Sequence, residues 1–271
     1  MTPHPLASRL VAEFVGTALL LAGVVGSGIM AETLSGDVGL QLLQNAFATA
    51  GVLVALILAL GPASGAHFNP AVTLADRIFG GITTRDAAAY IAVQVAGGIV
   101  GVIAANVMFD LSAIDWSTTD RSAGHLVFAE GIATFGLLLV IFGVVRSGKA
   151  GLAAFAVGGY IAGAYYFTSS TSFANPAVTI ARTFSDSFAG IEPASAPAFI
   201  AAQLLAVGVA ALVIKAIYPD IDQVADQVAD QVIVPHSAGA PSSDMGAGSD
   251  RRRFARADTG CLLIEPSAVP T

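Results

Sequence analysis

The sequence contains one short polar motif twice, as Asn69-Pro70-Ala71 and as Asn175-Pro176-Ala177. Asparagine is a favoured N-cap. Proline is favoured at the first helical position, because the N–H that it lacks would be unsatisfied there anyway. Each triplet therefore predicts the start of a helix. The amide groups of Asn69 and Asn175 could also donate hydrogen bonds to a solute that passes between them, so the triplets predict a pore centre.

The elements that must position these triplets are long and apolar. Of the 271 residues, 55% are hydrophobic and 11% are charged, whereas about a quarter of a soluble domain is charged. A helix needs roughly 20 apolar residues to cross a bilayer. Six stretches qualify, and they predict an all-α membrane protein with six transmembrane helices: 10–31, 38–61, 87–109, 123–145, 150–167 and 194–214.

The triplets belong to an internal repeat. Residues 12–20 resemble residues 129–137, and both triplets are followed by Val-Thr. Each copy holds three spans, which is an odd number, so the second copy must enter the membrane from the opposite side. Inverted repeats of this kind place a solute path near the bilayer midplane. We expect a channel domain over 8–218, with repeats of about 8–110 and 123–218, between a short segment (1–7) and a disordered tail (219–271).

Each triplet follows a loop of small residues and precedes roughly ten helix-compatible residues. Ten residues make a helix of about 15 Å, which is half the hydrocarbon thickness. We therefore expect two re-entrant half-helices that enter from opposite faces and meet at the centre. The preceding loops are tolerable at membrane depth only where they line a wet cavity.

The charged residues bear on orientation and on partners. Ten of the twelve basic residues fall on one side of the six-span arrangement, and only Arg121 and Arg182 fall on the other. This bias predicts that both termini are cytoplasmic, in the cell (inner) membrane. No basic and aromatic pattern points to nucleic acid. No nucleophile–base set or metal cluster points to an enzyme, so we expect no catalytic residue, metal or cofactor.

The chain resembles the aquaporin (major intrinsic protein) family over about residues 8–218. The resemblance rests on both triplets, on the run 64–68 before the first, and on the paired acids Glu13 and Glu130. The resemblance implies a homotetramer in lipid, with one pore per subunit that passively conducts water, glycerol or related neutral solutes. It also implies that the two acids accept N–H groups of the re-entrant loops. His67 is expected on the cytoplasmic side of the pore, as a lining or bracing residue or as a pH gate.

The family has a second constriction toward the extracellular mouth. Counting from the triplets places it at Thr49, Gly163, Ser172 and Val178. Water-selective relatives have an aromatic residue, a histidine and an arginine at the first, second and fourth of these positions, and glycerol-conducting relatives keep the arginine. This chain has none of them, which predicts a wider and less charged filter. The pattern is similar to bacterial aquaporin-like channels associated with arsenic resistance, which pass neutral arsenite-type species; a generic glycerol channel is the alternative.

Two further points stay open in the sequence. Arg182 stands one helical turn beyond Val178, so we expect it to guard the outer vestibule; the alternative is an arginine anchored to a loop carbonyl or to a neighbouring subunit. A secondary active transporter would also use inverted repeats and broken helices, but it would need a coupling site, and the only midplane acids are Glu13 and Glu130. The physiological solute is not specified by these residues.

Overall fold

The computed structural model describes residues 4–219. This range contains eight α-helices and no strand. Six of the helices are long and apolar enough to cross a membrane. They are α1 (Leu6–Leu34), α2 (Val38–Ser64), α4 (Thr84–Met108), α5 (Gly124–Arg146), α6 (Ala153–Phe167, preceded by the 3-10 turn η1, Ala150–Leu152) and α8 (Ala196–Ile217). The six predicted spans are confirmed, whereas residues 220–271 of the predicted tail lie outside the described range.

The two half-helices are also present. The first, α3 (Pro70–Ile78), begins directly after Asn69, and the second, α7 (Pro176–Ala181), begins directly after Asn175. Each asparagine caps its own helix by accepting a hydrogen bond from the backbone N–H two residues later. The second half-helix is shorter than predicted, because after six residues the chain tightens into the 3-10 turn η2 (Arg182–Phe184).

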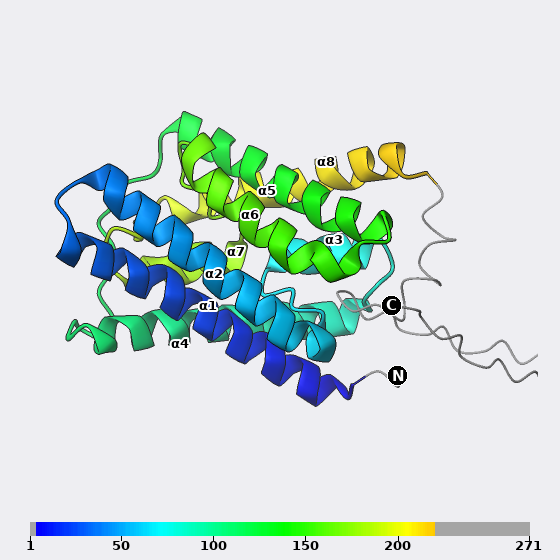
Figure 1. The fold of residues 1–271 in the computed structure, drawn as a ribbon, viewed down its shortest axis with the longest axis horizontal. Helices are drawn as coiled ribbons and strands as arrows, with labels where there is room; N and C mark the ends of the chain where they lie inside the picture. Colours follow the sequence, from blue (N-terminus) through cyan, green and yellow to red (C-terminus); the bar gives the residue numbers. More distant parts are fainter. Residues whose placement is uncertain (1–3, 220–271) are drawn as a thin grey trace, which may run out of the picture. The chain divides into compact units, whose positions relative to one another are not determined.

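The long helices form two groups, and each half-helix contacts both of them. In the first group α1 contacts both α2 and α4, and in the second α5 contacts both α6 and α8 (Figure 1). The half-helix α3 packs against α8 as well as α4, and α7 packs against α4 as well as α8. Each half-helix thus lies between a helix of its own group and a helix of the other, which brings the two triplets together.

Glycine allows the closest of these contacts. A Cβ atom on Gly97 or Gly101 of α4 would overlap the backbone carbonyl oxygen of Phe14 or Ala18 on α1. The backbones of α1 and α4 are therefore in direct contact, as small residues spaced by four allow in membrane helices. This contact fixes α1, the helix that carries Glu13.

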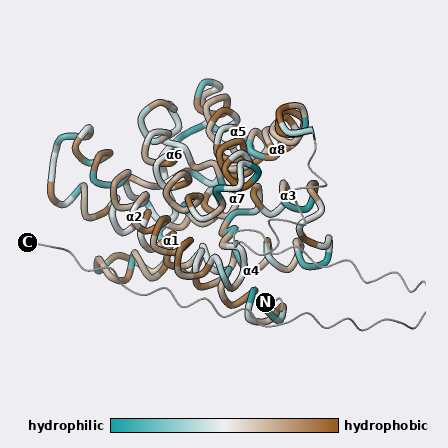
Figure 2. The backbone as a smooth tube through the Cα atoms, turned by 45° about the vertical axis from the view of Figure 1, so that its right-hand side comes forward, coloured by the Kyte–Doolittle hydropathy of each residue, from teal (hydrophilic) through white to brown (hydrophobic). Residues whose placement is uncertain are grey.

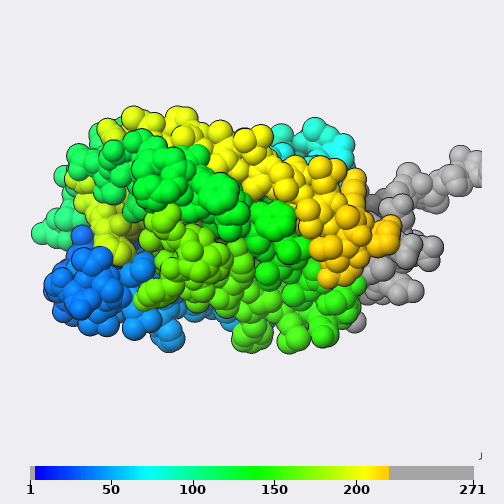
Figure 3. Space-filling view, turned by 90° about the horizontal axis from the view of Figure 1, so that it is seen from above, coloured from blue at the N-terminus to red at the C-terminus, as the bar shows by residue number. Residues whose placement is uncertain are grey.

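The outward faces of the long helices are apolar. Large hydrophobic side chains such as Phe47, Phe128 and Leu205 are more than two thirds exposed. In Figure 2 the helices are mainly white to brown, and the face seen in Figure 3 is formed largely by α5, α6 and α8. Such apolar surfaces are suited to contact with lipid or with another membrane helix.

Candidate functional site

A cavity runs between the two groups of helices, and both triplet asparagines line it. Leucine, isoleucine and valine side chains of α1, α2, α5 and α6 form one part of its wall. The two re-entrant loops form another part and bring polar groups to it. The polar and charged side chains that reach the cavity are Thr49, His67, Asn69, Tyr165, Ser172, Asn175 and Arg182. The result is an amphipathic path, with hydrogen-bonding groups along the loops and apolar groups elsewhere.

The two asparagines hold each other's loops at the centre of this path. The Nδ2 atom of Asn69 donates to the carbonyl of Ala174 at 2.8 Å, and Nδ2 of Asn175 donates to the carbonyl of Phe68 at 2.8 Å. An amide nitrogen carries two hydrogens. One hydrogen of each asparagine is used in this crossing, so the other remains for a solute in the cavity.

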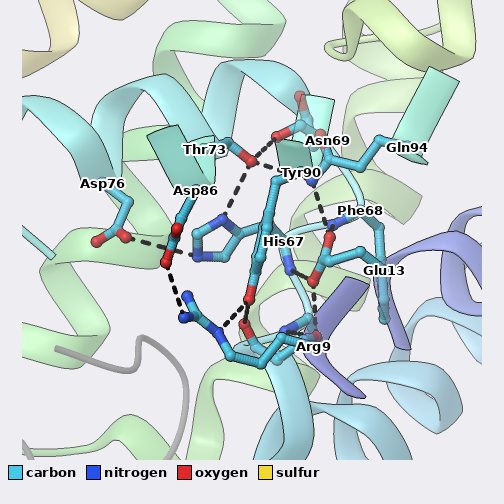
Figure 4. A network of polar contacts seen from close by, with 12 residues as sticks. Arg9, Glu13, His67, Phe68, Asn69, Thr73, Asp76, Asp86, Tyr90 and Gln94 are labelled. Atoms are coloured by element: carbon cyan, nitrogen blue, oxygen red, sulfur yellow. Dashed lines mark hydrogen bonds and ion pairs between the residues drawn. The ribbon is translucent and has the colours of Figure 1, made fainter. Parts of the chain in front are cut away.

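Two buried carboxylates hold the loops from behind. Oε1 of Glu13 accepts from the His67 N–H at 2.9 Å, and Oε2 accepts from the Phe68 N–H at 2.7 Å. The side chain of Gln94 donates to the same carboxylate (Figure 4), and so does the hydroxyl of Ser64. Glu13 thus accepts two loop N–H groups and two side-chain donors, and its own exposure is 0%.

Glu130 repeats this arrangement in the second half. It accepts the N–H groups of Phe173 and Ala174 at 2.9 and 2.8 Å, and Gln203 donates to it at 2.7 Å. Both carboxylates therefore serve as acceptors for a loop that has no helix or sheet to satisfy its N–H groups. Such groups would otherwise be costly at membrane depth.

The loops need this support because their backbone is strained. Ala66 and Phe68 in the first loop have φ values of 49° and 47°, and Ser172 and Ala174 in the second have 54° and 49°. A left-handed backbone costs roughly 1–2 kcal/mol for a residue with a Cβ atom. Sequence reasoning missed this feature, because no glycine stands at these four positions to signal it.

At the outer constriction the structure corrects one predicted position. Thr49, Ser172 and Val178 line the cavity, but Gly163 lies on the exposed face of α6, where an added Cβ would contact nothing within 4 Å. The α6 residues in the wall are Ile161 and Tyr165. They are four residues apart on one face, and Gly163 lies between them on the opposite face. Counting back from the triplet therefore reaches a position on the face of α6 that points away from the cavity.

This correction places an aromatic residue at the constriction. The Tyr165 hydroxyl lies 3.1 Å from the Thr49 hydroxyl, and both residues are at most 3% exposed. Phe173, next to Ser172, also lines the cavity. The predicted absence of aromatic rings holds for the four counted positions, but it does not hold for the wall that the fold builds.

Arg182 is also placed differently from the prediction. It is 2% exposed and lines the same cavity as Val178, so it is a buried residue of the cavity wall and not an exposed residue of a vestibule. Its Cζ lies 3.5 Å from the centroid of the Phe173 ring, and its Nε donates to the carbonyl of Ala189. The sequence left open that Arg182 is anchored to a loop carbonyl. This is the case for Nε, which is one of the three guanidinium nitrogens.

On the other side of the triplets, His67 lines the cavity beside a buried acid. Its Nδ1 lies 3.1 Å from the Thr73 hydroxyl, and its Nε2 lies 3.8 Å from Oδ2 of Asp76 (Figure 4). Arg9 donates to the Tyr90 hydroxyl at 2.8 Å, and that hydroxyl donates to the carbonyl of Ser64. Asp76, which is 1% exposed, was not singled out in the sequence. Its signal was its position, seven residues after Asn69.

Comparison with known proteins agrees with this geometry. The family model described as "Major intrinsic protein" matches residues 2–168. The chain belongs to the major intrinsic protein family. The match covers α1 to α6 and the first triplet, and it ends before the second triplet and α8.

Several relatives of this major intrinsic protein are curated or solved. "Aquaglyceroporin AqpS" of Rhizobium meliloti (strain 1021) is 49% identical over 205 residues, which are 76% of this chain and 88% of that protein. Aquaporin-5 of Ovis aries is 30% identical over 190 residues, 63% of this chain and 69% of that protein. The X-ray structure of the aquaglyceroporin from Plasmodium falciparum has the same fold, with a TM-score of 0.62 at 22% sequence identity. The superposition covers 81% of this chain and all of the Plasmodium chain.

Replacing Asn69 or Asn175 by leucine should impair conduction. Each change removes a helix cap worth about 1 kcal/mol, and it frees the opposite loop carbonyl, Ala174 or Phe68. We expect a lower glycerol flux per inserted protein or a rise in ion leakage, measured by stopped-flow light scattering and an ion-sensitive dye in proteoliposomes. Ser147→Ala, on an exposed residue, serves as the control. Parent-like flux and selectivity in both leucine variants would contradict this placement of the asparagines.

Proposed function

We propose that this chain is a passive channel for small uncharged solutes, namely water, glycerol-like polyols and neutral metalloid hydroxides such as arsenite. The observation that carries the proposal is the cavity in which the two half-helices meet through Asn69 and Asn175. The name of the relative from Rhizobium meliloti, an aquaglyceroporin, supports the polyol part. The arsenite part rests on valine at position 178, where glycerol-conducting relatives have arginine.

The mechanism follows from charge and hydrogen bonding at the centre. The N-termini of α3 and α7 both point at the asparagines, and each helix N-terminus carries roughly half a positive charge. Cations, including hydronium, are repelled there. The free amide hydrogens of Asn69 and Asn175 donate to the oxygen of a passing solute. A water held in this way donates away from the centre on both sides, which interrupts a continuous proton wire.

The carboxylates favour a channel over an ion-coupled transporter. A transporter needs an acid whose oxygens can bind the coupling ion or carry its proton. Both oxygens of Glu13 and both oxygens of Glu130 already accept loop N–H groups. Binding a proton or sodium there would release a strained loop, so these acids are suited to support and not to coupling.

The same proposal includes assembly and orientation. We place the protein in the cell (inner) membrane as a homotetramer with a pore in each subunit and both termini in the cytoplasm. The distribution of basic residues supports the orientation. The apolar outer faces of the helices supply surface both for lipid and for neighbouring subunits.

Flux of glycerol through the reconstituted protein should follow its gradient alone. Without a coupling site, a protonophore or the removal of sodium should leave the flux in proteoliposomes unchanged, and labelled glycerol should equilibrate without overshoot. Protein-free liposomes are the control. Accumulation of glycerol above equilibrium under a proton or sodium gradient would contradict passive conduction and favour an ion-coupled transporter.

Val178→Arg should narrow the filter. The change places a second guanidinium in a cavity wall that already contains Arg182. We expect the ratio of glycerol flux to water flux to fall by about tenfold or more. A tenfold change corresponds to roughly 1.4 kcal/mol in the barrier to glycerol. Val178→Met, which adds length without charge, is the matched control and should have a smaller effect. An unchanged ratio of glycerol to water flux in Val178→Arg would show that position 178 does not set selectivity.

A further inference from the structure

Arg182 is a buried cation without a carboxylate partner in the described part of the chain. Within residues 4–219 the one arginine–carboxylate ion pair joins Arg9 to Asp86, and the buried Asp76 lies 3.8 Å from His67. A buried charge is costly unless it is paired or hydrogen-bonded. Arg182 is instead supported by the ring of Phe173 and by one loop carbonyl. The fold therefore retains a positive charge in the wall of the cavity, where a neutral side chain would be cheaper.

Most of the donors of this guanidinium are unused. A guanidinium has five N–H groups. The Nε–H of Arg182 donates to Ala189, whereas within residues 4–219 no hydrogen bond leaves its two terminal nitrogens. Since Arg182 lines the cavity, the four remaining N–H groups are available to a solute. The hydroxyl of Ser172 is buried in the same wall and also lacks a hydrogen-bond partner within this range.

A second arginine, Arg121, adds positive charge near the same ring and braces the neighbouring loops. The Cζ of Arg121 lies 5.1 Å from the centroid of the same Phe173 ring. Its guanidinium is engaged with backbone carbonyls, most closely that of Gly190 at 2.9 Å. Arg121 thus braces the outer loops, while Arg182 presents its terminal nitrogens to the cavity.

The inverted repeat explains why Arg182 points inward. Arg182 is seven residues after Asn175 and contacts the ring two residues before it. In the first half, the residue seven after the asparagine is Asp76, and it faces the ring two residues before, His67. Both rings line the cavity. The geometry of a half-helix therefore directs this position toward the ring of its own loop in both halves.

We propose that Arg182 is the cation-rejecting and specificity-determining residue of the outer constriction, supplied from one helical turn beyond Val178. The proposal deepens the proposed function and rests on it. Valine at 178 leaves room in the wall, and the guanidinium stacked on Phe173 supplies the charge and the donors. The preferred solutes are neutral molecules with several oxygen acceptors, which bind the terminal nitrogens of the guanidinium, and cations are rejected at the same level.

Three variants in proteoliposomes test this proposal, with glycerol flux and cation leakage measured on the same preparation. Arg182→Ala should raise the leakage of sodium and methylammonium ions above that of the parent. Arg182→Lys keeps a charge and should still reject cations, but it should discriminate less between glycerol and urea, because lysine lacks the planar fork. The double variant Val178→Arg with Arg182→Ala moves the guanidinium back by one turn and should restore cation rejection. Arg85→Ala, on an exposed arginine, is the control.

The outcomes separate this inference from the proposed function. Absence of glycerol flux in the parent would contradict the channel itself. A conducting Arg182→Ala variant that rejects cations as well as the parent would overturn the role of Arg182 alone, as would equal leakage in Arg182→Ala and the double variant. If Arg182→Ala fails to insert, Arg182→Met, which keeps the length and apolar contact with Phe173, takes its place with the same expected leakage.

Discussion

Hydrogen bonds from loop N–H groups to two buried carboxylates are the interaction on which the pore depends. Glu13 and Glu130 are both fully buried in the transmembrane part of the chain. Each accepts two consecutive N–H groups of a loop that has no regular secondary structure. In lipid, irregular backbone persists only where its polar groups are satisfied by protein or by a wet cavity. The carboxylates satisfy the N–H groups from behind, which leaves the cavity side of each loop free for a solute.

The remaining geometry follows from this support. Because the loops are held at mid-depth, the half-helices begin there, and the asparagines that cap them reach across to the opposite loop. The two halves carry different side chains at one pair of equivalent positions, however. The first places Asp76 behind a cavity-lining ring, and the second places Arg182 behind one. The shared architecture thus builds the passage, and a carboxyl group and a guanidinium at equivalent positions give its two ends different chemistry.

The fold could be predicted from sequence because its signals are local and repeated. Long apolar stretches mark the membrane helices, and an asparagine followed by proline marks each half-helix start. The details of the constriction depend on chain geometry that counting does not capture. Gly163 lies on the exposed face of α6, and Ile161 and Tyr165 line the cavity instead. Arg182 follows the last residue of α7, which has only six residues, and its side chain lines the cavity.

One signal in the sequence was available but unused. Comparing the two repeats position by position, beyond the triplets themselves, aligns Asp76 with Arg182 and His67 with Phe173. Two charged residues at one equivalent position in buried half-helices already indicate a common direction. Apart from Gly65, the left-handed residues of the loops carry no such signal, since alanine, phenylalanine, threonine and serine stand where glycine would be expected.

The most direct test of this account replaces each carboxylate by its amide. Glu13→Gln and Glu130→Gln keep the size of the side chain but remove one acceptor, which leaves a buried loop N–H unpaired at a cost of roughly 1–3 kcal/mol. Glycerol flux per inserted protein and the midpoint of thermal unfolding in detergent would be measured for each variant and for both together, with Asp110→Asn as the control on an exposed acid. The account predicts that each change lowers both quantities and that the double variant conducts no faster than protein-free liposomes. A double variant with parent-like flux and stability would contradict it.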